Sequence, residues 1–298
     1  MRVAVTGSTG LIGTALVAQL RLDGHTVSRL VRRSAASADE ISWDPVAGTV
    51  DLAALEGTEA VFHLAGAGVG DHRWTDAYKA EILNSRVLGT QTIARALAAL
   101  ASPPAVLVSG SAIGWYGDTG DQIVDEQAPA GQGFLAEVVQ AWEAATATAS
   151  EAGIRVVHAR TGLVVARDGG AWARMFPLFR LGVGGKLGPG NQYWSWISLR
   201  DEISALLYCM TNSAISGPVN LTGPSAVTNS EVTSAMGRVM GRPTLLPVPA
   251  AALKIVLGEF SSEVLGSIRV TPAVLQAAQF AWADTTIESA ISTAWRSP

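Results

Sequence analysis

The first half of the chain alternates short β-branched runs with longer segments in which apolar residues recur every three or four positions. The run RVAVT at 2–6 predicts a strand, and the spacing of Ile12, Leu16 and Leu20 predicts a helix that ends before Gly24. Further strands are predicted at 25–31, 40–43, 59–66, 105–111 and 154–160, and further helices at 76–100 and 134–152. This alternation predicts βαβ units, and therefore an α/β fold of the Rossmann type with a doubly wound parallel sheet.

The pattern changes after about residue 165. A glycine-dense loop at 181–193 is followed by a helical run at 202–210 and a short strand with turns at 217–223. We therefore expect a dinucleotide-binding Rossmann domain at 1–165 and a smaller α/β substrate-binding unit at 166–298, with some segments returning to the main sheet.

The bulk composition narrows the class of protein. Of the 298 residues, 48% are apolar and 15% are charged, as in a globular protein, and the net charge of −4 gives no reason to expect nucleic acid or an anionic membrane as a partner. The single cysteine, Cys209, excludes an internal disulfide and a thiolate metal cluster. We see no signal peptide and no apolar run of the roughly 18 residues that a membrane span needs, so we expect a cytoplasmic protein.

The segment VTGSTGLIG joins the first strand to the first helix and has glycines three residues apart, at Gly7, Gly10 and Gly13. The first glycine allows a tight turn, the second lets a pyrophosphate approach the backbone, and the third lets the helix pack close to the strand. The start of the helix then offers unpaired N–H groups to phosphates. The segment therefore predicts a dinucleotide site that also includes Thr9, Leu11 and Ile12, although a purely structural turn is the alternative.

The end of the second strand distinguishes between cofactors. Binders of NAD normally place Asp or Glu there to hold the ribose 2′-hydroxyl. This chain has Arg32, Arg33 and Ser34, whose guanidinium and hydroxyl groups suit a 2′-phosphate. We therefore predict NADP(H) as the cofactor; two solvated arginines in a loop are the alternative.

Five motifs in order carry a resemblance to a known superfamily: TGSTGLIG (6–13), FHLAG (62–66), SRVLGTQ (85–91), VSGSAIGWYGD (108–118) and YWSWISLRD (193–201). Together they resemble the extended and atypical short-chain dehydrogenases/reductases, the NAD-dependent epimerase/dehydratase superfamily. Within it the chain is similar to the bacterial "epimerase family protein" branch, some actinobacterial members of which carry a cell-division-inhibitor label. The resemblance implies that Leu64, Ala65, Gly66, Ser109 and Arg160 also line the cofactor, that Ser111 takes the place of the catalytic serine, and that a homodimer is common.

The chain departs from the superfamily at its Tyr-x-x-x-Lys pair, in which the tyrosine exchanges a proton with the substrate and the lysine lowers the pKa of that tyrosine. The residues four positions after the four tyrosines are Ile82, Gly120, Ile197 and Asn212, so no such pair exists. In the segment FLAEVVQAWE (134–143), where the pair would be expected, an apolar stripe predicts packing into the core.

Other groups remain as candidates for chemistry. Ser111 could hold a substrate oxygen beside the nicotinamide, and Tyr116, in the loop after the strand at 105–111, is the best substitute proton donor; an ordinary strand-end serine and a loop-anchoring tyrosine are the alternatives. Asp118 in the same loop is a weaker acid–base candidate. His63 and His158 lie inside strand patterns, where a lone histidine is usually a core residue, and no cluster has metal-ligand spacing.

A small-molecule substrate is the expected partner. Arg86 stands where the superfamily motif usually begins with asparagine, and it could polarise a carbonyl or fix a carboxylate, or form a salt bridge with Glu81 or Asp118. Residues 166–200 contain five basic residues and one acid, which suits an anionic substrate, and Trp194 and Trp196 could form an apolar wall beside it. A solvated basic face with core tryptophans is the alternative.

Three functions follow from these features: an NADP-dependent oxidoreductase of atypical mechanism acting on a small carbonyl or alcohol; a non-catalytic NADP(H)-binding sensor or regulatory protein; and a nucleotide-sugar epimerase or dehydratase. The third needs acid–base groups on both faces of a sugar, which the sequence does not reveal.

Overall fold

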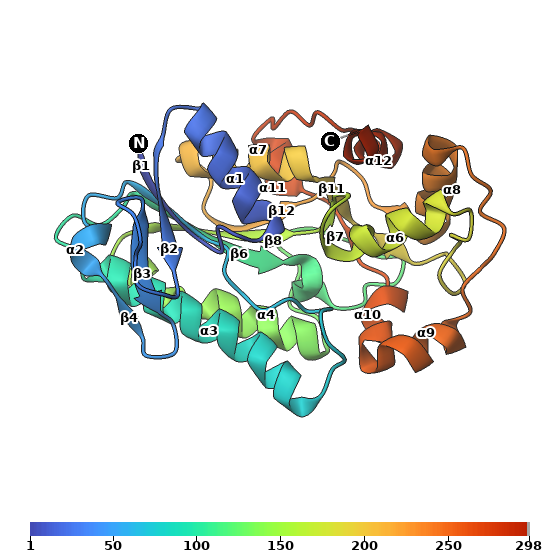
Figure 1. The fold of residues 1–298 in the computed structure, drawn as a ribbon, viewed down its shortest axis with the longest axis horizontal. Coiled ribbons are helices and arrows are strands. Elements are labelled where there is room, and N and C mark those ends of the chain that lie inside the picture. The colour runs from blue at the N-terminus through green and yellow to red at the C-terminus, as the bar shows by residue number, and fades with distance from the viewer. Residues whose placement is uncertain (297–298) are drawn as a thin grey trace.

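A computed structural model describes residues 1–296 of the chain. Its centre is an eight-stranded sheet in the order β12-β8-β6-β5-β1-β2-β3-β4, in which only the pairing of β3 with β4 is antiparallel (Figure 1). The strands are β1 (Arg2–Thr6), β2 (Thr26–Val31), β3 (Glu40–Asp44), β4 (Thr49–Val50), β5 (Ala60–His63), β6 (Val106–Ala112), β8 (Arg155–Thr161) and β12 (Gly217–Leu221). The predicted Rossmann-type α/β fold is confirmed.

Helices cover both faces of the sheet (Figure 1). One face carries α1 (Leu11–Leu22), α7 (Leu199–Thr211) and α11 (Ala273–Ala277), and the other carries α2 (Leu52–Leu55), α3 (Asp76–Ala98), α4 (Phe134–Ala144) and α5 (Ala147–Glu151). The central strands β1, β5 and β6 are buried along almost their whole length, because helices cover them on both sides.

The remaining elements gather beyond the carboxyl ends of the parallel strands, at the right of Figure 1. They comprise α6 (Gly170–Arg180), α8 (Asn229–Met240), α9 (Ala250–Leu257), α10 (Ser261–Leu265), α12 (Ile287–Arg296), the 3₁₀ turns η1 (Ile113–Tyr116) and η2 (Gly258–Phe260), and the short strands β7 (Ile123–Val124), β9 (Leu163–Val165), β10 (Tyr193–Trp194), β11 (Trp196–Ser198), β13 (Val227–Thr228) and β14 (Arg269–Val270). Much of this unit packs around its own core of Trp172, Phe176, Trp196 and Ile291. One strand from beyond residue 165, β12, returns to the main sheet and forms its edge beside β8.

Two expected elements differ from the structure. The helix expected over 134–152 is two helices, α4 and α5, because the Thr146 hydroxyl and backbone N–H both bond to the carbonyl oxygen of Glu143 at the end of α4. The strand expected over 59–66 ends at His63, because the N–H groups of Leu64 and Ala65 donate to the Thr6 hydroxyl instead of to a neighbouring strand. The predicted apolar stripe of α4 does lie in the core: Val138, Val139 and Trp142 are all buried.

Candidate functional site

The three glycines of the turn between β1 and α1 have different surroundings. Gly7 has φ +65°, and a Cβ on it would lie 2.7 Å from the carbonyl carbon of Leu64. A Cβ on Gly13 would overlap the carbonyl oxygen of Gly7, so this glycine lets α1 pack against the turn. A Cβ on Gly10 would approach nothing nearer than the Gly7 carbonyl oxygen, at 3.4 Å. Gly10 therefore faces open space, where a ligand can approach its backbone.

The first turn of α1 offers hydrogen-bond donors that the helix itself cannot use. The helix begins at Leu11, and no side chain caps its start. The N–H groups of Leu11, Ile12 and Gly13 precede the first intrahelical bonds, and Thr9 is exposed in the turn before them. A pyrophosphate fits this arrangement because it is anionic and accepts several hydrogen bonds.

A buried hydrogen-bond cluster shapes the loop after β5. The Thr6 hydroxyl oxygen accepts from the N–H groups of Leu64 (3.1 Å) and Ala65 (3.2 Å) and lies 2.9 Å from His63 Nδ1. A hydroxyl has two lone pairs and one proton, so the Thr6 proton is donated to Nδ1, and the ring carries its own proton on Nε2. Burial lowers the pKa of His63 to about 4. The cluster holds the start of the loop 64–66 beside Gly7.

The two arginines after β2 lie in different environments. Arg33 donates to both carboxylate oxygens of Glu40, each at 2.7 Å, and this bidentate pair is the main cause that lowers the pKa of Glu40 to about 2. Arg32 is exposed, and no hydrogen bond or ion pair of its side chain is present within the described chain. Ser34 is exposed beside them. The corner therefore presents an unpaired guanidinium and a hydroxyl, the groups that a 2′-phosphate needs.

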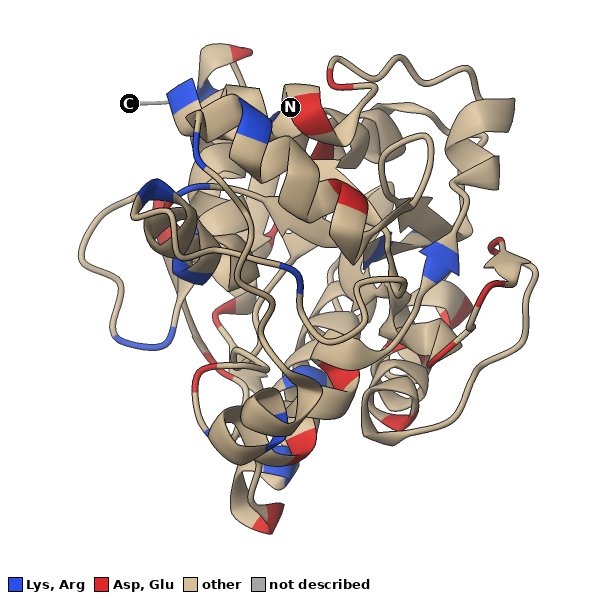
Figure 2. Cartoon of the chain, turned by 90° about the vertical axis from the view of Figure 1, so that its right-hand side faces the viewer, with Lys and Arg blue, Asp and Glu red and all other residues tan. Residues whose placement is uncertain are grey.

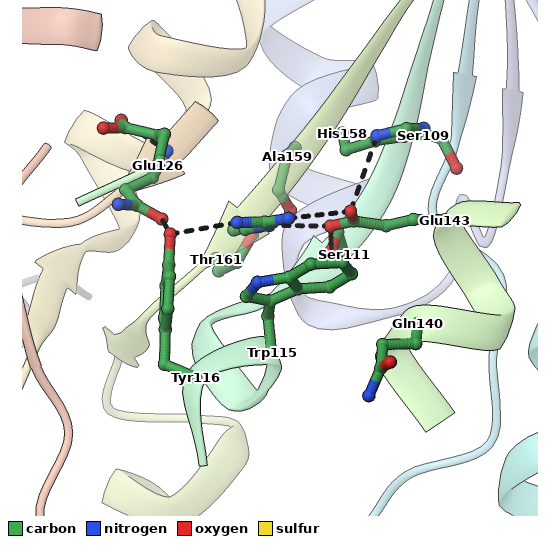
Figure 3. A network of polar contacts seen from close by, with 12 residues as sticks. Ser109, Ser111, Trp115, Tyr116, Glu126, Gln140, Glu143, His158, Ala159 and Thr161 are labelled. Carbon is green, nitrogen blue, oxygen red and sulfur yellow. Dashed lines mark hydrogen bonds and ion pairs between the residues drawn. The ribbon is translucent and has the colours of Figure 1, made fainter. Parts of the chain in front are cut away.

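Where β6, β8 and α4 meet, a polar network surrounds Glu143 (Figure 3). Its carboxylate accepts from the Ser111 hydroxyl at 2.6 Å and from two nitrogens of the Arg160 guanidinium, Nε at 2.8 Å and Nη2 at 2.9 Å. His158 Nδ1 lies 3.6 Å from the same carboxylate, and burial lowers the pKa of His158. Ser111, Glu143 and Arg160 are all buried.

Glu143 was not among the residues expected to form the site. The sequence offered one signal, because Glu143 follows the buried Trp142 at the end of an apolar stripe, and a buried carboxylate needs a charged partner. The stripe alone does not identify that partner, which lies 17 residues away on β8.

Tyr116 contacts a third nitrogen of the Arg160 guanidinium, Nη1, which Glu143 does not use; Figure 3 shows Tyr116 and Ser111 at opposite ends of the network. Its phenol donates to Asn220 Oδ1 at 2.7 Å and accepts from Arg160 Nη1 at 3.1 Å, and burial raises its pKa. The phenolic proton is thus used inside the protein, which fits the loop-anchoring alternative rather than a proton donor to substrate. Arg160 likewise directs its guanidinium to Glu143 and Tyr116, and this geometry gives no support for direct cofactor contact. Ser109 is fully buried in β6, with its hydroxyl on the neighbouring Gly110 carbonyl.

The expected substrate contacts are not brought together. Trp194 and Trp196 are 8% and 1% exposed and pack in the core of the C-terminal unit, so the expected apolar wall is wrong and the core alternative holds. Arg86 forms no ion pair with Glu81 or Asp118; it donates to the carbonyls of Ala67 and Ile82, packs over the Trp142 ring, and burial lowers its pKa to about 10.

The basic residues of 166–200 do not converge either. Arg200 pairs with Asp284 at 3.1 Å, Arg174 donates to the Gly70 carbonyl, and Arg167 lies over the Trp295 ring. Figure 2 shows Lys and Arg distributed over several elements on this side of the molecule, with acidic residues between them. Asp118 accepts from two backbone N–H groups, of Gly120 and Ser267, and acts as a turn residue.

Residues 1–296 contain no group of three His, Cys, Asp or Glu side chains placed to hold a metal ion.

Among the helices of this same range, none combines the length and the apolar character that crossing a bilayer requires.

Comparison with known proteins gives the family of the chain. The family model described as the NAD dependent epimerase/dehydratase family matches residues 3–222, and a domain of unknown function matches residues 248–294. An epimerase family protein of Mycobacterium tuberculosis is 45% identical over 99% of this chain and 98% of its own length.

Two solved structures are also similar. The human epimerase family protein SDR39U1 (isoform 2), crystallised with NADPH, is 31% identical with a TM-score of 0.92, over 99% of this chain and all of that one. A protein of Corynebacterium glutamicum described as a nucleoside-diphosphate sugar epimerase is 35% identical with a TM-score of 0.81, over 98% of this chain and 57% of that one. The expected superfamily is confirmed: the chain belongs to the NAD-dependent epimerase/dehydratase family.

Proposed function

We propose that this protein binds NADP(H) and transfers hydride between the nicotinamide and a small carbonyl or alcohol. The observation that carries the proposal is the phosphate-binding edge of the sheet, where Gly10 leaves its backbone open beside the uncapped start of α1 and Arg32 stands unpaired within the described chain. The NADPH bound to the human relative supports the choice of cofactor.

The residues present suggest how the cofactor would lie. The N–H groups of Leu11, Ile12 and Gly13 would hold the pyrophosphate, Arg32 and Ser34 the 2′-phosphate, and the loop 64–66 one side of the dinucleotide. The nicotinamide, which supplies or accepts the hydride, would then extend toward the carboxyl ends of β6 and β8, because ligands of open α/β sheets lie along that edge.

Glu143 determines what Ser111 can offer a substrate. The single proton of the Ser111 hydroxyl is donated to the Glu143 carboxylate, which Arg160 keeps in place through two hydrogen bonds. The Ser111 oxygen therefore has lone pairs available and no proton, so it can accept from a substrate hydroxyl but cannot donate to a carbonyl oxygen. This arrangement favours a substrate bound as an alcohol, with water taking up the released proton in place of the missing tyrosine.

Calorimetry on protein stripped of nucleotide tests the cofactor. NADPH should bind at least about tenfold more tightly than NADH, which corresponds to about 1.4 kcal/mol. Oxidation of a panel of small alcohols with NADP⁺ then tests the reaction. Ser111→Ala should lower the rate and leave NADPH affinity unchanged; full activity in this variant would remove Ser111 from the mechanism, and absence of nucleotide binding would overturn the whole proposal.

A specific observation favours a second function, a non-catalytic NADP(H)-binding sensor. Ser111 and Tyr116 are 4% exposed and their hydroxyl protons are used inside the protein, so neither needs a substrate to complete its hydrogen bonds. This alternative predicts tight NADPH binding, no turnover on the alcohol and carbonyl panel, and a protein partner captured only when NADPH is present. Turnover that depends on Ser111 would exclude it.

A further inference from the structure

The corner that would meet the 2′-phosphate holds two adjacent arginines in unequal states. Arg33 is bound to Glu40 through two parallel hydrogen bonds of 2.7 Å, and its Nη1 also donates to the Ser34 carbonyl at 2.9 Å. Arg32 makes no such bond to any residue of the described chain. The sequence does not distinguish the two arginines, whereas in the structure Arg33 is paired with a carboxylate and Arg32 is not.

The residue responsible is Glu40, the first residue of β3. Its side chain is only 3% exposed, and besides Arg33 it accepts from Arg29 Nη2 at 3.1 Å and from the Ala36 N–H at 2.9 Å. A carboxylate with these partners stays ionised, and its charge largely cancels that of Arg33. A nearby acid is usually unfavourable to a 2′-phosphate, so its presence here requires an explanation.

We propose that Glu40 is a specificity-determining residue of the nucleotide site. Glu40 neutralises Arg33 and uses it to fix the loop, so that Arg32 alone provides the preference for the 2′-phosphate. By competing with that phosphate for Arg33, Glu40 limits the preference for NADPH over NADH. This inference rests on the proposed binding of NADP(H).

The expected effect of neutralising Glu40 has a definite sign. In Glu40→Gln the amide oxygen still accepts one or two of the same hydrogen bonds, and the loop keeps a second anchor, the Ala35 N–H on Ser42 Oγ at 2.8 Å. The loop should therefore stay in place while the negative charge disappears. An Arg33 guanidinium without a paired carboxylate can then turn to the phosphate as a charge-assisted donor.

The experiment measures the dissociation constants of NADPH and NADH on the full chain by calorimetry, and uses their ratio as the readout. NADH lacks the 2′-phosphate, so a change that only loosens the fold weakens both nucleotides and leaves the ratio unchanged. We expect Arg32→Ala to reduce the preference for NADPH by about tenfold or more and Arg33→Ala to reduce it by less than about threefold.

Glu40→Gln should increase the preference for NADPH over NADH by about three- to tenfold. The double variant Arg32→Ala/Glu40→Gln should recover part of the preference that Arg32→Ala loses. In a protein that already carries Arg33→Ala, Glu40→Gln should leave the preference unchanged. Asp39→Asn is the matched control, because Asp39 is an acid on the same loop that pairs with Arg21 (2.7 Å) and Arg29 (3.4 Å) and forms no ion pair with Arg33. An equal increase in Asp39→Asn would mean a general charge effect and overturn the special role of Glu40.

An equal loss in the two arginine variants, or an unchanged or lower ratio in Glu40→Gln, would also overturn it. If the wild-type protein binds NADPH and the variants fail in these ways, this inference alone is wrong. If the wild-type protein binds neither nucleotide, the proposed function itself fails.

Discussion

The proposed phosphate-binding edge of the sheet and the corner between β6, β8 and α4 differ in whether their polar groups have hydrogen-bond partners within the described chain. Around α1, N–H groups and the Arg32 guanidinium have no partner within the described chain. In the corner, Ser111, Glu143 and Arg160 are buried and bonded to one another. Buried polar groups need hydrogen-bond partners inside the protein, whereas groups at an open surface can bond to water until a ligand binds. The first region leaves its polar groups open to a ligand. The second region uses most of its polar groups to hold its own geometry, and leaves only the lone pairs of the Ser111 oxygen for a substrate.

It follows that substitutions in the two regions should have different consequences. Changes at the phosphate-binding edge should weaken nucleotide binding with little effect on the free energy of unfolding. Changes in the Glu143 corner should lower that free energy first. Both regions lie at the carboxyl end of one parallel sheet. A clean separation of the two effects would show that Glu143 and Arg160 stabilise the fold and do not contact the nucleotide.

The largest effect is expected from Glu143→Ala. The substitution leaves the buried Arg160 guanidinium without its carboxylate, which typically costs about 3–5 kcal/mol. Urea unfolding followed by circular dichroism measures the loss. Glu137→Ala, at an exposed position of the same helix, is the control and should change stability by less than about 0.5 kcal/mol. A loss below about 1 kcal/mol in Glu143→Ala would mean that the network is not structural.

Acid should weaken the fold through His63. The folded pKa of about 4 lies below the ordinary value of 6.5, so its contribution is fully present above pH 6.5 and is lost as the pH falls toward 4. The lowered pKa of His63 corresponds to a change of about 3 kcal/mol in the free energy of unfolding between these two pH values. The free energy of unfolding, measured from pH 7 to pH 4, should therefore fall more steeply in the wild type than in His63→Asn, whose amide oxygen can still accept from Thr6. Parallel pH profiles for the two proteins would refute the assignment of a buried neutral His63.

Gly10→Ala distinguishes the two regions most directly. The added methyl group has room in the protein, with the nearest atom 3.4 Å away, but it occupies the approach to the backbone. We expect about tenfold or more weaker NADPH binding by calorimetry, with a melting temperature within a few degrees of the wild type. Gly13→Ala is the contrasting variant, because its methyl group overlaps the Gly7 carbonyl oxygen and should lower the melting temperature as well. Unchanged affinity in Gly10→Ala would remove the pyrophosphate from this turn.

A smaller loss of stability than in Glu143→Ala is expected from Tyr116→Phe. The phenol donates to Asn220 and accepts from Arg160, and loss of such bonds typically costs about 1–2 kcal/mol of stability. NADPH affinity and any turnover should stay close to wild type once the variant is folded. A variant with normal stability and no turnover would instead restore Tyr116 as the proton donor and break the distinction between the two regions.

Much of the proposed nucleotide site was accessible to sequence reasoning because its signals are local. The glycines at 7, 10 and 13 and the arginines at 32 and 33 lie at the ends of strands that the β-branched runs already reveal. The Glu143 network was not accessible in this way, because Ser111, Glu143 and Arg160 belong to three different elements that only the order of the strands brings together. Trp194 and Trp196 show the same limit, since a tryptophan after a glycine-rich loop can equally line a cleft or fill a core.

The sequence by itself determined the alternation of strands and helices, the family, the glycine-rich turn after β1 and the absence of the Tyr-x-x-x-Lys pair. These features depend on neighbouring residues, whose geometry follows from backbone chemistry over a few positions. Only the tertiary structure decided which charges are paired: Arg33 with Glu40, Arg160 with Glu143, and Arg32 with no residue of the described chain. Pairing depends on distance in space, and the parallel sheet brings side chains within 3 Å that lie far apart in the sequence, as with Tyr116 and Asn220.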